Sequence, residues 1–248
     1  MTKKSYLISA IYFITNRLRL FLLLIVFFSF VPLAFSQKAK TPFGELYGLD
    51  QELYNGRRYV YFPPLQTGGH QFLQSEGFSQ GSVRLRGKLY TDLLLNFDIY
   101  NQQLVMRYLN QLGATEQLAI SDAWLQGFSF NGMRFEYLEM ADSSWKIAQV
   151  IGEKPFEILI FWTKNLSLDT RYGATNHVFS KAQKKTWLRN NELMQAFKNK
   201  RDFVKLFSKD FQSDLKKYMR KERFSFKKTS DESIAELLRF CSSNLTKL

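Results

Sequence analysis

The sequence has few of the residues from which metal, thiol and disulfide sites are built. It contains one cysteine, Cys241, and two histidines, His70 and His177, which lie far apart and form no HExxH or paired-cysteine pattern. Zinc sites need such closely spaced ligands. A Walker loop and a dinucleotide-binding fingerprint are also missing, and we therefore predict no metal and no nucleotide cofactor. One cysteine allows no intramolecular disulfide, and we expect Cys241 to be a small buried residue on a helix.

Acidic residues are missing from the first 36 positions, which have the pattern of a secretory signal peptide. Basic residues come first, and the hydrophobic run Leu20–Leu33 follows them. Ala34 and Ser36 then match the small-x-small pattern that signal peptidase cleaves, which predicts cleavage after Ser36. The alternative is an uncleaved anchor, but the run is shorter than the roughly 20 apolar residues of a membrane-spanning helix. We therefore predict an exported protein with no transmembrane span after cleavage. The basic residues are Lys3, Lys4, Arg17 and Arg19.

Acidic residues are again scarce at the other end of the chain. Residues 37–177 carry 13 basic and 14 acidic side chains, whereas residues 178–248 carry 18 basic and 8 acidic ones, a net charge of +10. A basic surface favours anionic partners. Because export makes nucleic acid an unexpected partner, we expect an anionic component of the cell envelope. A solvated lysine-rich face that aids solubility is the alternative. The candidate contact residues are Lys216, Lys217, Arg220 and Lys221.

No interval between residues 59 and 162 has the pattern of a long amphipathic helix. Apolar residues alternate with polar ones from Val83 to Leu89 and again from Leu93 to Ile99, which predicts half-buried strands. Asn131-Gly132 is the preferred pair for a type I′ hairpin turn. That turn sets Phe128 opposite Phe135 and Phe130 opposite Met133 on one face. We expect an antiparallel β-meander, either curled or closed into a partial barrel.

The segment Phe156–Trp162 is apolar on both of its alternating faces. Such a strand is covered on two sides or lines a cavity. A carrier for an apolar ligand, which would use the curled sheet as its pocket, is therefore one alternative function. Residues 163–184 are polar and irregular and read as a connection, and a last hairpin is expected between 185 and 197.

Beyond residue 198 the apolar period changes to that of a helix. One helix is predicted from Asn199 through Tyr218, with Asn199 as its cap, and a second begins at a capping box, Thr229–Glu232. The predicted organisation is a signal peptide (1–36), an antiparallel β domain (37–197) and a basic two-helix segment (198–248) packed on the sheet. The fold class is α+β and mainly β. The apolar face of the second helix comprises Ile234, Leu237, Leu238 and Cys241.

Several short motifs occur in a recognisable order along the chain. They are Leu53–Tyr59, Gly69–Phe72, Gly81–Tyr90, Asn96–Tyr100, Phe203–Phe207, Leu215–Tyr218 and Phe226–Thr229. This order resembles uncharacterised exported proteins that are common in bacteria of the Bacteroidetes type. The resemblance implies a Gram-negative setting, in the periplasm or outer envelope, and no catalytic activity.

One catalytic pattern is present. Gly77-Phe-Ser79-Gln-Gly81 matches the nucleophile elbow of serine hydrolases, and Asp98 and His177 follow in the required order. A serine hydrolase that uses Ser79 is therefore the rival function. The elbow, however, needs a strand-turn-helix context, and the residues after Gly81 alternate as a strand. For Asp98 and Tyr100 we expect cross-strand pairing with Arg84 or Arg86 rather than acid catalysis. The function that we expect is binding or structural, without catalysis.

Overall fold

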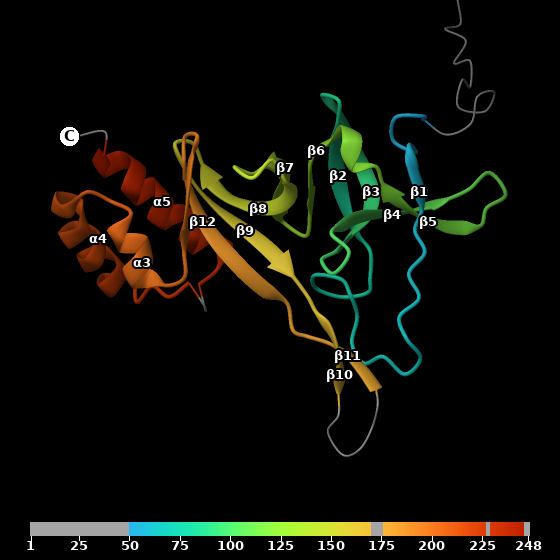
Figure 1. The fold of residues 1–248 in the computed structure, drawn as a ribbon. Coiled ribbons are helices and arrows are strands. Elements are labelled where there is room, and N and C mark those ends of the chain that lie inside the picture. Colours follow the sequence, from blue (N-terminus) through green and yellow to red (C-terminus); the bar gives the residue numbers. More distant parts are fainter. Residues whose placement is uncertain (1–49, 170–175, 227–228, 246–248) are drawn as a thin grey trace, which may run out of the picture. The chain divides into compact units, whose positions relative to one another are not determined.

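The computed structural model describes residues 50–169, 176–226 and 229–245 (Figure 1). The predicted signal peptide and its cleavage site lie outside these ranges. Strands predominate, and helices follow them at the C-terminal end. The predicted α+β, mainly β class is therefore confirmed. A short 3₁₀-helix, η1 (Asp122–Trp124), interrupts the strands.

Eleven strands form one antiparallel sheet in the described part of the chain. Their order is β1-β5-β4-β3-β2-β6-β7-β8-β9-β12-β13, and β1 and β13 are the outer strands, so the sheet is open. The remaining two strands, β10 and β11, pair with each other. The strands are β1 (Gly56–Arg58), β2 (Ser79–Leu85), β3 (Lys88–Asp98), β4 (Gln103–Leu109), β5 (Thr115–Ile120), β6 (Leu125–Phe130), β7 (Met133–Glu139), β8 (Trp145–Glu153), β9 (Phe156–Thr163), β10 (Leu166–Asp169), β11 (Asn176–Phe179), β12 (Gln183–Asn190) and β13 (Leu193–Phe197).

The β6–β7 hairpin has the predicted register. Asn131 and Gly132 both have positive φ, 50° and 72°, as a type I′ turn requires. Phe130 pairs with Met133 and Phe128 with Phe135. The rings of Phe128 and Phe135 stack with their centroids 4.6 Å apart, and both are buried. This face forms the centre of the hydrophobic core over β2–β7.

Two segments between the predicted strands differ from expectation. The interval Val83–Leu89 is a hairpin rather than one strand, because Arg86 and Gly87 adopt φ values of 47° and 85° and reverse the chain. The turn was hidden because the alternation of apolar and basic residues continues across it. Residues 163–184 are not merely irregular, since β10 and β11 form a ribbon within them.

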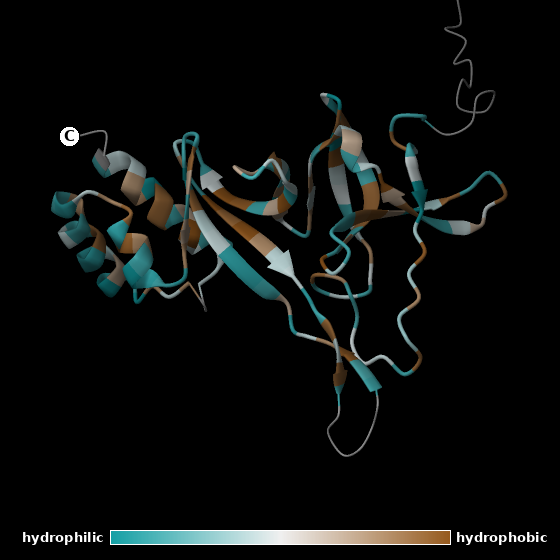
Figure 2. Ribbon diagram, in the orientation of Figure 1, coloured by the Kyte–Doolittle hydropathy of each residue, from teal (hydrophilic) through white to brown (hydrophobic). Residues whose placement is uncertain are grey.

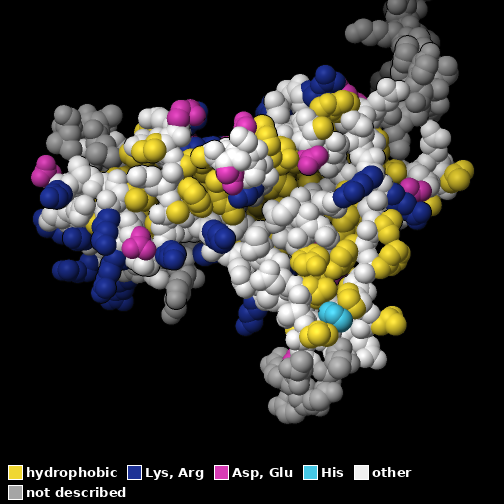
Figure 3. Space-filling view, viewed as in Figure 1, with side chains coloured by type: hydrophobic (Ala, Val, Ile, Leu, Met, Phe, Trp, Pro, Cys, Tyr) yellow, Lys and Arg dark blue, Asp and Glu magenta, His cyan; other side chains and the backbone are white. Residues whose placement is uncertain are grey.

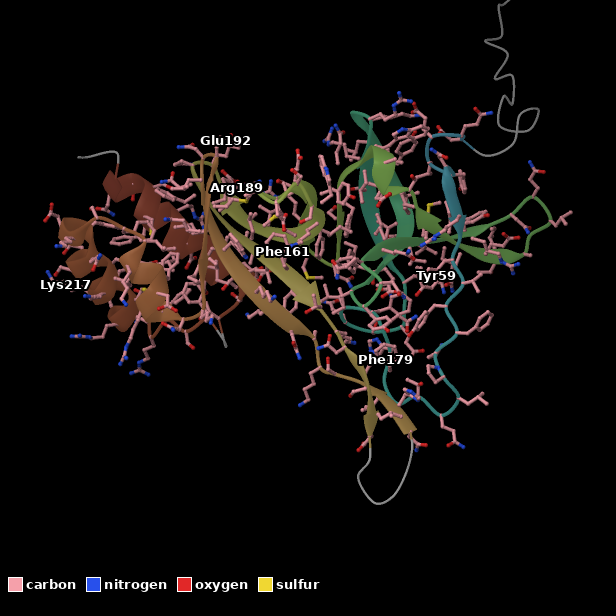
Figure 4. The ribbon with its side chains drawn as sticks, viewed as in Figure 1. Tyr59, Phe161, Phe179, Arg189, Glu192 and Lys217 are labelled. Carbon is pink, nitrogen blue, oxygen red and sulfur yellow. The ribbon has the colours of Figure 1, made fainter. Side chains whose placement is uncertain are left out.

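Both faces of β9 are covered by side chains. Ile158 and Ile160 point into the core that the C-terminal helices cover. Leu159 and Phe161 lie on the opposite face and are also buried, beside Trp187. Figure 2 shows the resulting hydrophobic run along β9, and Figure 4 marks Phe161. Of the two interpretations of this segment, a strand covered on both sides is therefore the one that the structure has. Leu159 and Phe161 pack on Met140, Ala148, Val150, Leu138 and Met194.

Three α-helices lie in the described C-terminal residues: α3 (Lys200–Lys205), α4 (Lys209–Lys221) and α5 (Asp231–Leu245). The first predicted helix is therefore two helices: α3 ends at Lys205 with Leu206 as its C-cap, and Ser208, with a non-helical ψ of 149°, is the N-cap of α4. Asn199 caps α3 as predicted, since its side chain accepts hydrogen bonds from the backbone N–H groups of Arg201 and Asp202. Among the described residues, no helix has the length and apolar character to cross a membrane.

Helix α5 packs on β8 and β9 through its predicted apolar face, and Cys241 is fully buried there. The predicted capping box is shifted by one residue. Ser230 Oγ lies 3.4 Å from the backbone nitrogen of Ser233, whereas Thr229 Oγ1 donates to the Ser225 carbonyl. Gly152, which has a φ of +92°, permits the close approach, because a Cβ at this position would lie 2.5 Å from Leu238 Cδ1.

Candidate anion-binding site

A basic groove lies between α3 and α4. Its volume is about 800 Å³. Four of the side chains that line it are cationic, and none of the described lining side chains is acidic. Figure 3 shows dark blue Lys and Arg side chains gathered over these helices. We call this feature the α3–α4 groove, and it is lined by Asn199, Lys200, Arg201, Val204, Lys205, Gln212 and Lys216.

The four predicted contact residues all lie on α4, but they belong to two different stripes of it. At 3.6 residues per turn, Lys216 and Arg220 continue the stripe of Gln212, which lines the groove. Lys217 and Lys221 fall on a neighbouring stripe, labelled at Lys217 in Figure 4. There the acids Asp210 and Asp214 are interleaved with them, and Lys217 Nζ lies 3.3 Å from Asp214 Oδ1. Lys216 and Arg220 are therefore the two with an uncompensated positive environment.

Like charges meet across the groove. Burial, together with the charge of Arg220, lowers the pKa of Lys200 below its ordinary value. An anion bound in the groove would relieve this repulsion between cations. Lys200, Arg201 and Lys205 were not predicted as partners of Lys216, because the groove exists only through the break between α3 and α4. The i, i+4 spacing of Arg201 and Lys205 on a short helix was the one available signal.

Ser79 does not have the surroundings of a catalytic serine. It is the first residue of β2, which leads into the turn at Arg86 rather than into a helix. His177 lies on β11, and the Asp98 carboxylate is held by other groups. The strand-turn-helix context of a nucleophile elbow is therefore not formed. No group of three or more potential metal ligands occurs within the residues described.

Asp98 is fully buried and does not pair with Arg84 or Arg86, contrary to expectation. Its carboxylate accepts hydrogen bonds from the Tyr59 hydroxyl at 2.7 Å and from the backbone N–H of Asn101 at 2.8 Å. Because β3 ends at Asp98, its side chain serves the following turn instead of a cross-strand contact. Burial and the bond to Asp98 raise the pKa of Tyr59. This network is a structural one, and it holds the extended segment around Tyr59 against β3.

A second charge network crosses β7, β9 and β12. The buried Glu157 carboxylate lies 2.7 Å from Arg189 and 3.1 Å from Arg134, and Arg189 also contacts Glu136 at 2.8 Å. Burial lowers the pKa of Arg189, but the two carboxylates outweigh it and raise the pKa. Because the two arginines and two glutamates neutralise one another, this network is a poor candidate for binding an external anion.

Comparison of the chain with protein-family models, with curated proteins and with solved structures found no match.

Proposed function

We propose that this is an exported, non-catalytic binding protein of a Gram-negative periplasm or outer envelope, and that it binds an anionic envelope component through the α3–α4 groove. The observation that carries the proposal is the set of four cations, Lys200, Arg201, Lys205 and Lys216, around one groove without an acid among its described lining residues. The export part rests on the basic start and the hydrophobic run Leu20–Leu33.

Phosphate and carboxylate groups are the ligands that suit this chemistry. Arginine offers paired donors to them, and lysine offers a mobile point charge. Each Lys or Arg near an anionic surface contributes roughly 1 kcal/mol of binding free energy. Four such residues are enough for a measurable affinity. This affinity should weaken as salt is added, because the Debye length is only about 10 Å at 0.1 M salt and exposed charges are then screened.

The test compares two double variants of the same helix. Lys216→Glu with Arg220→Glu reverses the groove stripe, whereas Lys217→Glu with Lys221→Glu makes the same charge change on the stripe that already contains acids. Binding of the full chain is measured to vesicles of phosphatidylglycerol and phosphatidylcholine, to pure phosphatidylcholine vesicles and to soluble polyphosphate. Melting curves check that both variants fold.

We expect binding to the anionic vesicles that weakens steeply with salt, and at least a tenfold larger loss for the groove variant than for its control. Binding to polyphosphate alone would assign the site to soluble anions and would overturn the envelope part. Equal losses in both double variants, or binding that is insensitive to salt, would overturn the groove as the binding site.

A further inference from the structure

A second hollow lies on the sheet, away from the basic helices. It is formed where η1 and the start of β6 meet the β7–β8 hairpin, and its volume is about 800 Å³. Two tryptophans and a tyrosine share it with three polar side chains of different character. We call it the tryptophan cleft, and its lining includes Arg86, Asp122, Trp124, Gln126, Tyr137 and Trp145.

One aromatic side chain of the cleft, that of Trp145, is exposed, whereas Trp124 and Tyr137 are half-buried. Trp145 is 53% exposed although a Trp ring buries a large apolar area when it is covered. Tyr137 lies beside it, with ring centroids 5.1 Å apart and an interplanar angle of 34°, and this contact supports one side of the indole. The indole is therefore held as a platform that is still largely in contact with solvent. An exposed aromatic ring that is held in place contributes favourable binding free energy when an apolar face of a ligand covers it.

The polar groups of the cleft are fixed by contacts that leave donors and acceptors for a ligand. The backbone N–H of Gly87 donates to Gln126 Oε1 at 2.7 Å, so the amide nitrogen of Gln126 is the group that can donate outward. Tyr137 Oη donates to Asp122 Oδ2 at 3.3 Å, and the other carboxylate oxygen can accept. Arg86 stacks on Trp124, with Cζ 4.7 Å from the ring centroid, and its N–H groups lie in the plane of the guanidinium.

Two further hollows share a lining residue with the cleft. Gln126 also lines a hollow of about 460 Å³ over β2, β6 and β7, in which Ser82, Arg84 and Ser129 lie. Asp122 also lines one of about 450 Å³, which reaches Gln103. Both hollows contain polar side chains, so a chain of several rings has contacts beyond the cleft that a single ring does not reach.

From these observations we infer that the tryptophan cleft binds a neutral or weakly charged saccharide chain. A sugar ring has an apolar face of C–H groups, which stacks on an exposed indole, and a rim of hydroxyl groups. Those hydroxyl groups can both donate to Asp122 and accept from Gln126 and Arg86. A peptide of apolar side chains would leave the outward-facing donors and acceptors of these three groups without a partner, and burying them in that state is costly. This site is independent of the α3–α4 groove, because it uses other residues and other chemistry.

The test titrates the full chain with five hexasaccharides: cellohexaose, xylohexaose, mannohexaose, maltohexaose and chitohexaose. Calorimetry gives the affinity, and the intrinsic fluorescence reports on the cleft tryptophans. Trp145→Ala removes the platform and Trp145→Phe keeps an aromatic face. Phe62→Ala removes a still more exposed ring elsewhere, since Phe62 is 87% exposed. Repeating the titration at 0.5 M salt separates this site from an electrostatic one.

We expect saturable binding of at least one hexasaccharide, accompanied by a blue shift of the tryptophan emission and little effect of salt. Trp145→Ala should weaken it about tenfold or more, which corresponds to the loss of one anchoring contact, while Trp145→Phe and Phe62→Ala stay close to the unchanged chain. Failure of all five sugars to bind, or equal binding by the Trp145→Ala chain, would overturn the inference. So would a preference of the cleft for an extended apolar peptide, such as hexaleucine carrying solubilising ends.

Discussion

The hydroxyl of Tyr59 donates a 2.7 Å hydrogen bond to the fully buried carboxylate of Asp98. Tyr59 lies just beyond β1, and Asp98 ends β3, so the bond joins segments that are 39 residues apart. Gln71 reinforces the link by donating to the Tyr59 oxygen at 2.9 Å. The bond therefore fixes the extended chain after β1 to the body of the sheet.

Tyr59→Phe should lower the free energy of unfolding by about 1.5–3 kcal/mol, because it removes a hydrogen bond to a buried charged group while keeping the ring. Tyr61→Phe is the matched control, since the Tyr61 ring packs on that of Tyr100 with centroids 5.8 Å apart, while its hydroxyl makes no hydrogen bond to a buried carboxylate among the described residues. Urea unfolding of both variants measures the difference. If the two substitutions cost the same, the Tyr59–Asp98 bond does not have the role assigned to it.

The buried thiol of Cys241 makes stability depend on alkaline pH. Burial raises the pKa of Cys241 to about 12, from an ordinary value of 9.0. Above pH 9 the unfolded chain releases this proton and the folded chain keeps it. The contribution of the buried neutral thiol to the unfolding free energy is therefore fully present below pH 9 and is lost as the pH rises toward 12. One proton corresponds to about 1.4 kcal/mol per pH unit.

The unfolding free energy of Cys241→Ala should therefore fall less steeply between pH 9 and 10 than that of the unchanged chain. The cavity left by the substitution lowers stability equally at both pH values and cancels in the slope. Denaturant titrations at closely spaced pH values measure the slope. An identical slope for both chains would show that the thiol titrates normally in the folded state.

Local signals predicted more of this fold than of its sites. The β6–β7 register followed from Asn131-Gly132, because a two-residue turn fixes which residues lie opposite each other. The Arg86-Gly87 turn escaped because arginine is an uncommon residue at positive φ. The Tyr59–Asp98 bond and the cleft around Trp145 depend on which distant strands become neighbours. Periodicity within one strand contains no information about that choice.

The candidate anion site shows the same limit. The excess of basic residues after residue 178 is visible in the sequence, and so is the exposed face of α4. The difference between Lys216 and Lys217, however, depends on where α3 lies, and α3 is separated from α4 by the backbone of Ser208. Charge composition thus predicted the region, and the fold selects the residues within it.

Gly152 is a position at which one methyl group should loosen the attachment of α5. A Cβ there would lie 2.5 Å from Leu238 Cδ1 and 3.0 Å from the Phe156 carbonyl oxygen, in a backbone of φ +92°. Gly113→Ala is the control, since Gly113 also has positive φ (+76°) but no atom lies within 4 Å of the place that its added methyl group would take. The control should lose only the roughly 1–2 kcal/mol of left-handed backbone strain.

Gly152→Ala should lose a further 1–3 kcal/mol, approximately, from overpacking against α5. Chemical denaturation gives both values, and hydrogen exchange of α5 amides shows whether the loss is local. Equal stability of the two variants would mean that the helix can move away from β8 without cost.

The ion network around Glu157 should contribute to stability through its internal pairing. The Glu157 side chain is only 4% exposed and that of Arg189 13% exposed. Arg189→Leu therefore leaves a buried carboxylate with Arg134 as its remaining partner, and we expect a loss of about 3–5 kcal/mol. Replacing both residues, Glu157→Leu with Arg189→Leu, also removes the buried carboxylate, while Arg134 still faces Glu136 at 3.6 Å.

The double variant should therefore be more stable than Arg189→Leu alone, a strongly non-additive result in urea unfolding. Lys217→Leu is the control for loss of an ordinary ion pair, because Lys217 and Asp214 are both well exposed, and it should change stability little. If Arg189→Leu is as mild as this control, water reaches Glu157 readily and the carboxylate is not buried in solution. If instead the double variant is less stable than Arg189→Leu, the network stabilises by direct attraction that exceeds its desolvation cost.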